Sequence, residues 1–231
     1  MRLAKPGIDV GLSTNDLDGH LELFERMGLR YDHLLKVGGG IHQHRHETGN
    51  SVVKLNSHRA ALDAAPTGYV KLRLATDVDA PVATTTPDGV EIEWVPRGHD
   101  DIVGVEITWR TADLDRARAF LVDGLGADEI GGRFRVGESW VVLEHDPDQP
   151  RSGPFASRGF RYLTVQVFDA AAEHERLLGL GFEEGRAPVR LGDTAFISFV
   201  LDGDGNWIEI SQRASLTGDL PDVDGGRLDL G

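Results

Sequence analysis

The chain has 231 residues, of which 40% are hydrophobic and 27% charged, the composition of an ordinary globular protein. Cysteine is absent, which excludes disulfides, thiolate metal sites and cysteine nucleophiles, and the formal net charge of −14 argues against nucleic-acid binding because it repels phosphate backbones. The chain has no apolar run long enough for a membrane span and no signal-peptide pattern at its N-terminus, so we expect a cytoplasmic protein without membrane contact.

The first elements are predicted from the alternating apolar residues that begin near Val10, a period typical of a half-buried strand. Asp16 follows as a helix N-cap, apolar residues then recur at helical spacing, and Gly28 suits the left-handed turn that ends a helix. Three short strand patterns come next. Residues 8–56 are therefore predicted to form one β-α-β-β-β unit.

Three histidines alternate along the third strand of this unit, at residues 41–47, so His42, His44 and His46 share one face. If that face is concave, the imidazoles line a metal or substrate site. If the histidines face solvent instead, Gln43 and Arg45 take the inner side. Neither face is convincingly apolar, so both alternatives stay open.

On the next strand Lys54 and Asn56 share a face by the same alternation. Lys54 is surrounded by apolar neighbours along the strand and could hold a substrate carboxylate or enolate. The alternative is a surface lysine whose apolar stem covers the strand while its ammonium stays in water.

The same pattern recurs along the chain. Residues 68–97 form a shorter copy without a helix, because the segment between its strands is short and β-branched. Residues 103–145 and 160–212 repeat the full unit, with Asp113 and Asp169 in the place of the first helix cap.

These units predict an α+β fold of four tandem βαβββ units, the second lacking its helix, paired into two cupped-sheet domains. Pairing in chain order gives a first domain at 1–98, from units one and two, and a second at 99–214, from units three and four. Residues 215–231 form an acidic, turn-rich tail that we expect to lie loosely on the surface.

A repeated βαβββ unit whose helix ends in "GLGF" and whose last strand carries "DGNWIEI" resembles the vicinal oxygen chelate superfamily, the glyoxalase, bleomycin-resistance and extradiol-dioxygenase group. The resemblance implies a cup that binds a divalent metal through residues of the first and last strands. It transfers the first-strand ligand, seven residues before the helix-opening aspartate, to Asp9, Val70, Glu106 and Tyr162. It transfers the last-strand ligand to Asn56, Glu93, Glu144 and Glu209.

On this resemblance the expected cofactor is a divalent ion (Fe, Mn, Zn, Ni or Mg). The predicted ligands are Asp9, His42, His44, His46, Glu93, Glu106 and Glu209. The predicted catalytic groups are Glu93, Glu209 and His44, and the predicted substrate contacts are Lys54, Asn56, Arg110, Tyr162 and Trp207. If Glu93 lies on the concave face of its sheet, the same alternation places Lys71 and Arg73 on the opposite face. An error of one residue in this register would exchange the two faces for every residue.

The leading hypothesis for function is a metal-dependent isomerase or lyase that acts on a small oxygenated substrate through a metal-stabilised enolate, with a glutamate or histidine moving the proton. One alternative is a metal-free protein that binds small molecules on aromatic surfaces, in the manner of antibiotic-binding members. A ring-opening dioxygenase ranks lower, because the transferred positions of units three and four hold no histidine. A homodimer is expected by analogy with the family alone.

Overall fold

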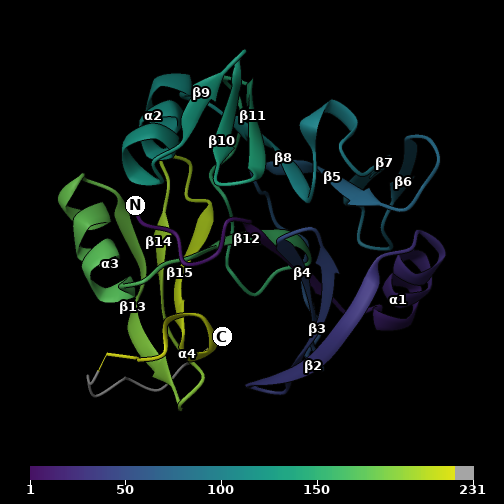
Figure 1. Cartoon of the computed structure of the whole chain (residues 1–231), viewed down its shortest axis with the longest axis horizontal. Coiled ribbons are helices and arrows are strands. Elements are labelled where there is room, and N and C mark those ends of the chain that lie inside the picture. Colours follow the sequence, from purple (N-terminus) through teal and green to yellow (C-terminus); the bar gives the residue numbers. More distant parts are fainter. Residues whose placement is uncertain (222–231) are drawn as a thin grey trace.

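The computed structural model describes residues 1–221 and repeats one order of elements (Figure 1). Unit one contains β1 (Asp9–Thr14), α1 (Leu17–Arg26), β2 (Arg30–Gly38), β3 (Ile41–Thr48) and β4 (Ser51–Ser57). Unit two contains β5 (Tyr69–Thr76), β6 (Val82–Thr85) and β7 (Glu91–Pro96). As predicted, no helix separates its first two strands in this described part of the chain.

The second half of the chain holds two full units. After a 3-10 turn (His99–Asp101), unit three contains β8 (Val105–Thr111), α2 (Leu114–Ala119) with a π-helical turn (Phe120–Gly124), β9 (Asp128–Ile130), β10 (Arg133–Val136) and β11 (Ser139–His145). Unit four contains β12 (Gly159–Gln166), α3 (Ala170–Gly179), β13 (Glu183–Leu191), β14 (Ala195–Leu201) and β15 (Trp207–Arg213), and α4 (Ala214–Thr217) follows. The predicted α+β class with two curled sheets is confirmed.

Each long helix begins at its predicted aspartate. The carboxylates of Asp16, Asp113 and Asp169 each accept a hydrogen bond from the amide three residues further on, at 2.9–3.0 Å. These bonds satisfy backbone donors that the first helical turn leaves free. Gly28 closes α1 with a φ of 73°, in the left-handed region that glycine adopts without strain.

Strand pairing corrects the predicted arrangement of the units. The strands form an eight-stranded sheet in the order β13-β14-β15-β12-β1-β4-β3-β2 and a seven-stranded sheet in the order β6-β7-β5-β8-β11-β10-β9. Units one and four therefore share the first sheet, and units two and three share the second. The expectation that units pair in chain order is wrong, and the boundary predicted after residue 98 falls between two units of one sheet.

The physical reason lies in the first strand of each unit. β1 pairs antiparallel with β12, and β5 pairs antiparallel with β8, so first strands meet in the middle of each sheet. The repeat pattern identifies these strands but carries no signal for which first strand is the partner. A bridge from Leu3 to Val167 completes the contact between the first and fourth units.

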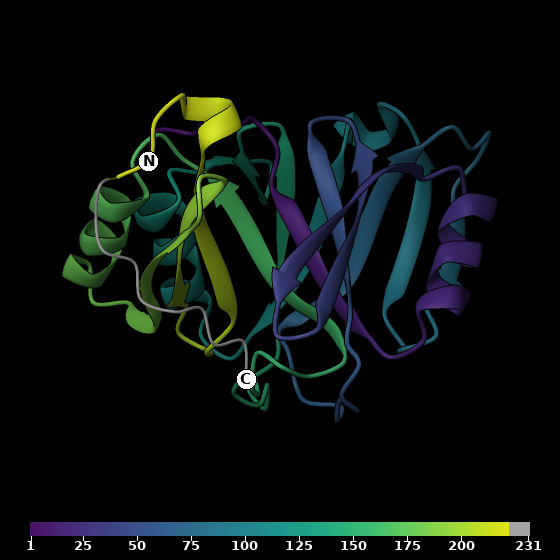
Figure 2. The same cartoon turned by 90° about the horizontal axis from the view of Figure 1, so that it is seen from below.

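One face of each sheet packs into a common core with the helices. Tyr69 of β5 stacks on Phe160 of β12 with ring centroids 4.8 Å apart, which joins the two sheets directly. Phe24 of α1 meets Trp94 of β7 at 6.0 Å. The helices lie at the two ends of the molecule, α1 at one end and α2 and α3 at the other (Figure 1), and the turned view looks onto the eight-stranded sheet between them (Figure 2). The opposite face of each sheet carries the polar residues considered below.

The start of the predicted tail is ordered against the eight-stranded sheet. Gln212 of β15 donates from Nε2 to the carbonyl of Asp219 at 2.9 Å, and Leu220 packs against the core. The remainder of the predicted tail, 222–231, lies outside the described residues. Within residues 1–221 no helix has the length and apolar character that a membrane crossing requires.

Candidate functional site

The eight-stranded sheet carries a hollow on the face turned away from the core, which we call cup one. The hollow and the solvent in its open mouth together occupy about 660 Å³. Its walls are mainly apolar and are built by Leu35, Val37, Ile41, Phe155, Tyr162, Leu191, Ala195, Ile197 and Phe199. Its floor is polar and comes from units one and four together.

A buried ion pair lies at the centre of this floor. The Nζ atom of Lys54 is 2.7 Å from Oε2 of Glu209, and their side chains are 4% and 10% exposed. Thr164 joins both groups, because its hydroxyl accepts from Lys54 at 2.6 Å and donates to Glu209 at 2.6 Å. Burial lowers the pKa of the Lys54 ammonium, and the negative charges of Glu209 and Asp9 oppose that shift.

Lys54 and Glu209 occupy the same place in their two units. Lys54 lies beside Gly11 in the parallel pair β1–β4, and Glu209 lies beside Thr164 in the parallel pair β12–β15. Gly11 and Thr164 are each two residues beyond the transferred first-strand position of their own unit. The last-strand position of unit one is therefore Lys54, and its assignment to Asn56 is wrong by two residues.

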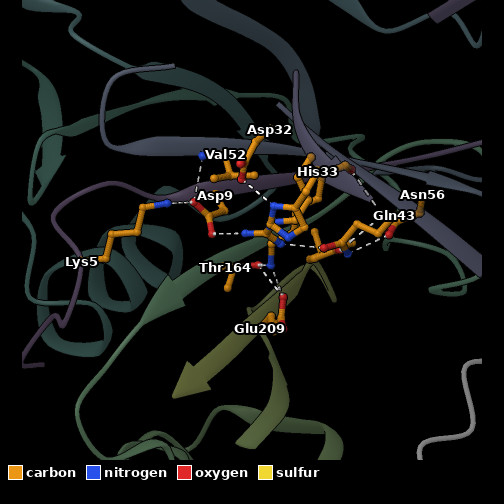
Figure 3. A network of polar contacts seen from close by, with 12 residues as sticks. Lys5, Asp9, Asp32, His33, Gln43, Val52, Asn56, Thr164 and Glu209 are labelled. Carbon is orange, nitrogen blue, oxygen red and sulfur yellow. Dashed lines mark hydrogen bonds and ion pairs between the residues drawn. The ribbon is translucent and has the colours of Figure 1, made fainter. Parts of the chain in front are cut away.

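Asp9 lies at the edge of the floor, and one of its two carboxylate oxygens accepts hydrogen bonds while the other, Oδ2, is buried without one. Its Oδ1 accepts from the Lys5 ammonium at 2.5 Å and from the backbone amide of Val52 at 2.9 Å, while its Oδ2 lies 4.0 Å from the Arg45 guanidinium (Figure 3). Asp9 is fully buried. Its charge is therefore balanced by neighbouring side chains of the chain itself.

A second polar cluster continues the floor toward β3. Gln43 donates to Asn56 at 3.0 Å, Asn56 donates to the Tyr162 hydroxyl at 3.2 Å, and Arg45 donates to Gln43 at 2.7 Å (Figure 3). Burial raises the pKa of Tyr162, and the Glu209 carboxylate raises it further, so this phenol stays protonated. The cluster holds Asn56 and Tyr162 in fixed orientations at the wall of the cup.

Two arginines give the cup a positive character. Arg45, Lys54 and Arg213 line it against the carboxylate of Glu209, a formal surplus of two positive charges among the lining residues of a chain of net charge −14, and the Asp9 carboxylate at the edge of the floor is itself paired with Lys5. Among residues 1–221 no carboxylate lies within ion-pair distance of Arg213. The Nε of Arg45 is buried and also lacks a hydrogen-bond partner there.

The three histidines lie on the other face of β3. Ile41, Gln43 and Arg45 face the cup, whereas His44 and His46 face α1. The ring of His46 packs edge-on against Phe24 at 5.0 Å, and burial lowers its pKa to about 4. The expectation that His42, His44 and His46 join Asp9 in one pocket is therefore wrong, because the core behind the sheet takes this face.

The seven-stranded sheet has a corresponding face, which we call cup two, and it is filled by ion pairs. The guanidinium of Arg73 lies 2.9 Å from Glu93, 2.9 Å from Glu106 and 2.7 Å from Asp100. Lys71 pairs with Glu93 at 3.0 Å, so Lys71 and Arg73 lie on the face of Glu93. The expectation that these two side chains point outward is wrong by one residue of register.

The transferred positions of units two and three consequently hold no free ligands. Glu106 also contacts Arg133 at 2.9 Å, and the ring of Trp140 lies 4.0 Å from the Arg133 guanidinium. Glu144 pairs with Arg110 at 3.2 Å at the exposed rim of the sheet. Ile92 and Trp94 alternate with Glu93 along β7 and belong to the common core.

The donor set of either cup does not fit a divalent metal. Cup one offers Asp9 and Glu209, each neutralised by a lysine, and cup two offers Glu93 and Glu106, both bound to Arg73. Within residues 1–221 no three histidine, aspartate or glutamate side chains lie close enough together to hold an ion. The predicted ligands are thus divided among three places, namely cup one, cup two and the face of β3 that is turned away from cup one.

The predicted substrate contacts are placed as follows. Lys54, Asn56 and Tyr162 line cup one, Trp207 packs behind its wall against Phe155 and Phe199, and Arg110 lies in the other sheet. The predicted catalytic groups never meet, because Glu209 is in cup one, Glu93 in cup two and His44 behind β3. The sequence alone missed Phe155 and Arg213, which lie in a connection and at a strand end.

Comparison with known proteins agrees with this architecture. Residues 105–210 match the model of the Glyoxalase/Bleomycin resistance protein/Dioxygenase superfamily. No curated protein matches the sequence significantly. These matched residues span units three and four, and so contribute to both cups.

Solved structures share the fold over nearly the whole chain. Glyoxalase I from Zea mays has a TM-score of 0.68 at 15% identity, covering 91% of this chain and 92% of the maize chain. A putative dioxygenase from Bacillus subtilis has a TM-score of 0.68 at 12% identity, covering 92% and 86%. The cppA protein from Streptococcus pneumoniae has a TM-score of 0.56 at 10% identity, covering 91% and 98%. The second half of the chain is thus similar to the superfamily of glyoxalases, bleomycin resistance proteins and dioxygenases, and the whole chain shares the fold of the solved structures named above.

Proposed function

We propose that cup one binds a small organic anion, a carboxylate carried on an apolar body. The observation that carries the proposal is the surplus of positive charge in an apolar hollow of an otherwise acidic protein. A pocket with apolar walls and a few fixed polar groups is the usual form of a small-molecule site.

The walls favour a ligand with a ring or a branched chain. Phe155 meets Tyr162 at 5.1 Å and Phe199 at 4.9 Å between ring centroids, and Ile41 and Ile197 extend the same apolar cluster. Burying an apolar group of the size of a leucine or phenylalanine side chain there contributes about 1.5–3 kcal/mol. The body of the ligand would thus displace water from the cup.

The anionic group of the ligand would meet Arg213 and Arg45. A guanidinium presents paired N–H donors that match a carboxylate, and such charge-assisted bonds are stronger than neutral ones. Burial lowers the pKa of the Arg213 guanidinium, and the nearby charge of Arg45 adds to the effect. An anion between the two arginines would relieve both the repulsion and the desolvation.

The proposal is tested with a set of small aromatic and branched aliphatic carboxylates, each paired with its neutral amide, by thermal shift and then titration calorimetry. We expect carboxylates to bind and their amides to bind about tenfold or more weakly, which corresponds to about 1.4 kcal/mol. Arg213→Gln should remove this preference. Arg151→Gln, which alters an exposed ion pair with Glu183, is the matched control and should leave it unchanged. Equal binding of acids and amides would contradict the proposal.

The location of the site has its own pair of variants. Ile197→Trp adds volume inside cup one and should abolish binding, whereas Ile130→Trp adds the same group at an exposed position of the other sheet. Binding that survives in Ile197→Trp would place the ligand elsewhere.

A metal-dependent isomerase or lyase is the second candidate, because the family match supports it. Lys54 beside Glu209 argues against it, since an ammonium lies among the expected ligands. Exchange of the proton next to the carbonyl of a hydroxy- or keto-carbonyl compound, followed by NMR in deuterated water with and without Mn²⁺, separates the two. Metal-stimulated exchange would favour the second candidate.

Two further expectations remain proposals. Location in the cytoplasm is supported by the absence of cysteine, which fits a reducing compartment. Homodimerisation rests on family analogy, and light scattering of the purified protein tests it.

A further inference from the structure

The internal repeat makes the centre of cup one asymmetric in charge. The equivalent positions of units one and four hold an ammonium, Lys54, and a carboxylate, Glu209, instead of two like groups. Because β4 and β15 flank the central pair β1–β12 and both side chains extend over that pair to one place, each fills the space opposite the other. The two equivalent positions of the repeat therefore supply both the positive and the negative charge at the floor of cup one.

We propose that the Lys54 ammonium is the resident cation of cup one, which keeps divalent metals out and donates its remaining hydrogen to an oxygen of the ligand. The second part rests on the proposed function. The first part does not depend on what the ligand is.

The hydrogen bonds of Lys54 carry the second part. An ammonium has three donors. Two are used by Thr164 and Glu209, at 2.6 and 2.7 Å. Within residues 1–221 no hydrogen-bond acceptor takes the third donor, and the Tyr162 ring lies 5.4 Å from Nζ, so an oxygen of a ligand in the hollow can accept it when the charged end of that ligand meets Arg45 and Arg213.

The charges around Glu209 carry the first part. A divalent ion at Glu209 would have to take the place of the Lys54 ammonium or lie beside it, and like charges in a buried site repel strongly. Asp9, the next carboxylate, is held by Lys5 and the amide of Val52. Glu209 is not available as a ligand without loss of its present partner, and the one unbonded oxygen of Asp9, Oδ2, lies 4.0 Å from the Arg45 guanidinium, whose charge opposes a metal ion there.

Cup two shows the same arrangement independently. There the guanidinium of Arg73 lies at 2.9 Å from both Glu93 and Glu106, which occupy transferred ligand positions. A basic side chain is thus paired with an acid at these positions in both sheets, although one is a lysine from a last strand and the other an arginine from a first strand.

The test compares metal content in four tag-free proteins, after chelation and dialysis against Mn²⁺ and, separately, Zn²⁺. The double variant Lys54→Met/Glu209→Leu removes both charges together and measures metal bound elsewhere. His44→Ala measures the contribution of the half-buried imidazole of His44 on the other face of β3. We expect wild type and the double variant to bind equal amounts, and Lys54→Glu, which places two acids opposite each other, to bind about one equivalent more.

Each result decides the inference. About one equivalent more in wild type than in the double variant would overturn it, and so would a folded Lys54→Glu variant that gains no metal. Near-UV circular dichroism reports folding, and Lys54→His replaces Lys54→Glu if the latter does not fold.

The donor role has a separate readout. The test uses the carboxylate that gives the largest thermal shift. Addition of a chelator should leave its affinity for wild type unchanged, and in chelator its affinity for Lys54→Met should be at least about tenfold weaker than for wild type. Equal binding to Lys54→Met would overturn the donor role. Absence of any carboxylate binding would defeat the proposed function, while the metal comparison would still stand.

Discussion

The two cups are built from the same unit, yet one is open and the other is filled. In cup one the acids and bases lie at the floor and apolar side chains form the walls. In cup two the guanidinium of Arg73 binds the carboxylates of Glu93, Glu106 and Asp100 across the face. The repeat therefore determines the sheet, but not whether its face can receive a ligand.

The order of the units along the chain explains the difference. Units two and three are consecutive, and the turn His99–Asp101 between them folds over cup two. The carbonyl of Asp101 accepts from Trp140 at 3.2 Å, and that of Asp100 from Arg133 at 3.0 Å. Units one and four come from opposite ends of the chain, so no short turn joins them across cup one, and the connection before unit four contributes Phe155 to its wall. A ligand site is expected where the paired units are distant in sequence.

The largest expected effect comes from the central pair of cup one. Glu209→Leu leaves the Lys54 ammonium buried without its partner, and we expect a loss of about 3–5 kcal/mol in the free energy of unfolding. Urea denaturation measures it. The double variant Lys54→Met/Glu209→Leu should recover most of the loss, since neither charge is then left alone. A double variant no more stable than the single one would contradict the central role of the pair.

The backs of the two cups differ in their response to pH. His46 lies behind cup one, whereas Phe134 and Val136 lie behind cup two. Because the folded pKa of His46 is lowered from 6.5 to about 4, the unfolded chain binds this proton first, and stability falls as pH drops through 6.5 and levels off near 4.

Between pH 7.5 and pH 5 this histidine should cost about 2 kcal/mol of unfolding free energy. Asp202, whose pKa burial raises to about 6, acts in the opposite direction, so the comparison with His46→Phe isolates the histidine. Urea denaturation at both pH values measures the difference. If the unfolding free energy of His46→Phe changed with pH as much as that of wild type, His46 would be already protonated or exposed in the folded state.

The filled cup should tolerate the loss of its basic residue better. Arg73→Met leaves Glu93 with Lys71 and Glu106 with Arg133, and Glu93 is 24% exposed, so we expect a loss of about 1–2 kcal/mol. Urea denaturation beside Glu209→Leu gives the comparison. A loss larger than that of Glu209→Leu would reverse the ranking of the two cups.

The smallest effect is expected at the rim of the second sheet. Arg110 and Glu144 are 35% and 47% exposed, so their pair is screened by solvent. Glu144→Gln should change the unfolding free energy by less than about 0.5 kcal/mol. A change comparable with that of Arg73→Met would show that the exposed rim also supports cup two.

Much of the fold could be predicted because its signals are local. The alternation of apolar and polar residues located the strands. An aspartate before each helix and a glycine after it located the helix ends, as Asp16 and Gly28 do for α1. The same alternation placed Lys54 and Asn56 on one face, which is the face of the cup.

The rest depended on partners that are distant in sequence. The pairing of β1 with β12 has no local signal, so the units were paired wrongly. His46 faces the core because Phe24 and Tyr31 pack against it, which the strand pattern alone does not reveal. Arg213 and Phe155 line the cup because the fold brings distant segments of the chain together there, and no local pattern in the sequence indicates it.

The most direct measurement is the anomalous scattering of crystals soaked in Mn²⁺, collected near the manganese absorption edge. The account predicts Lys54 Nζ in contact with Glu209 and no anomalous peak at that position. An anomalous peak at bonding distance from Glu209 and Asp9, with Lys54 moved away, would contradict it.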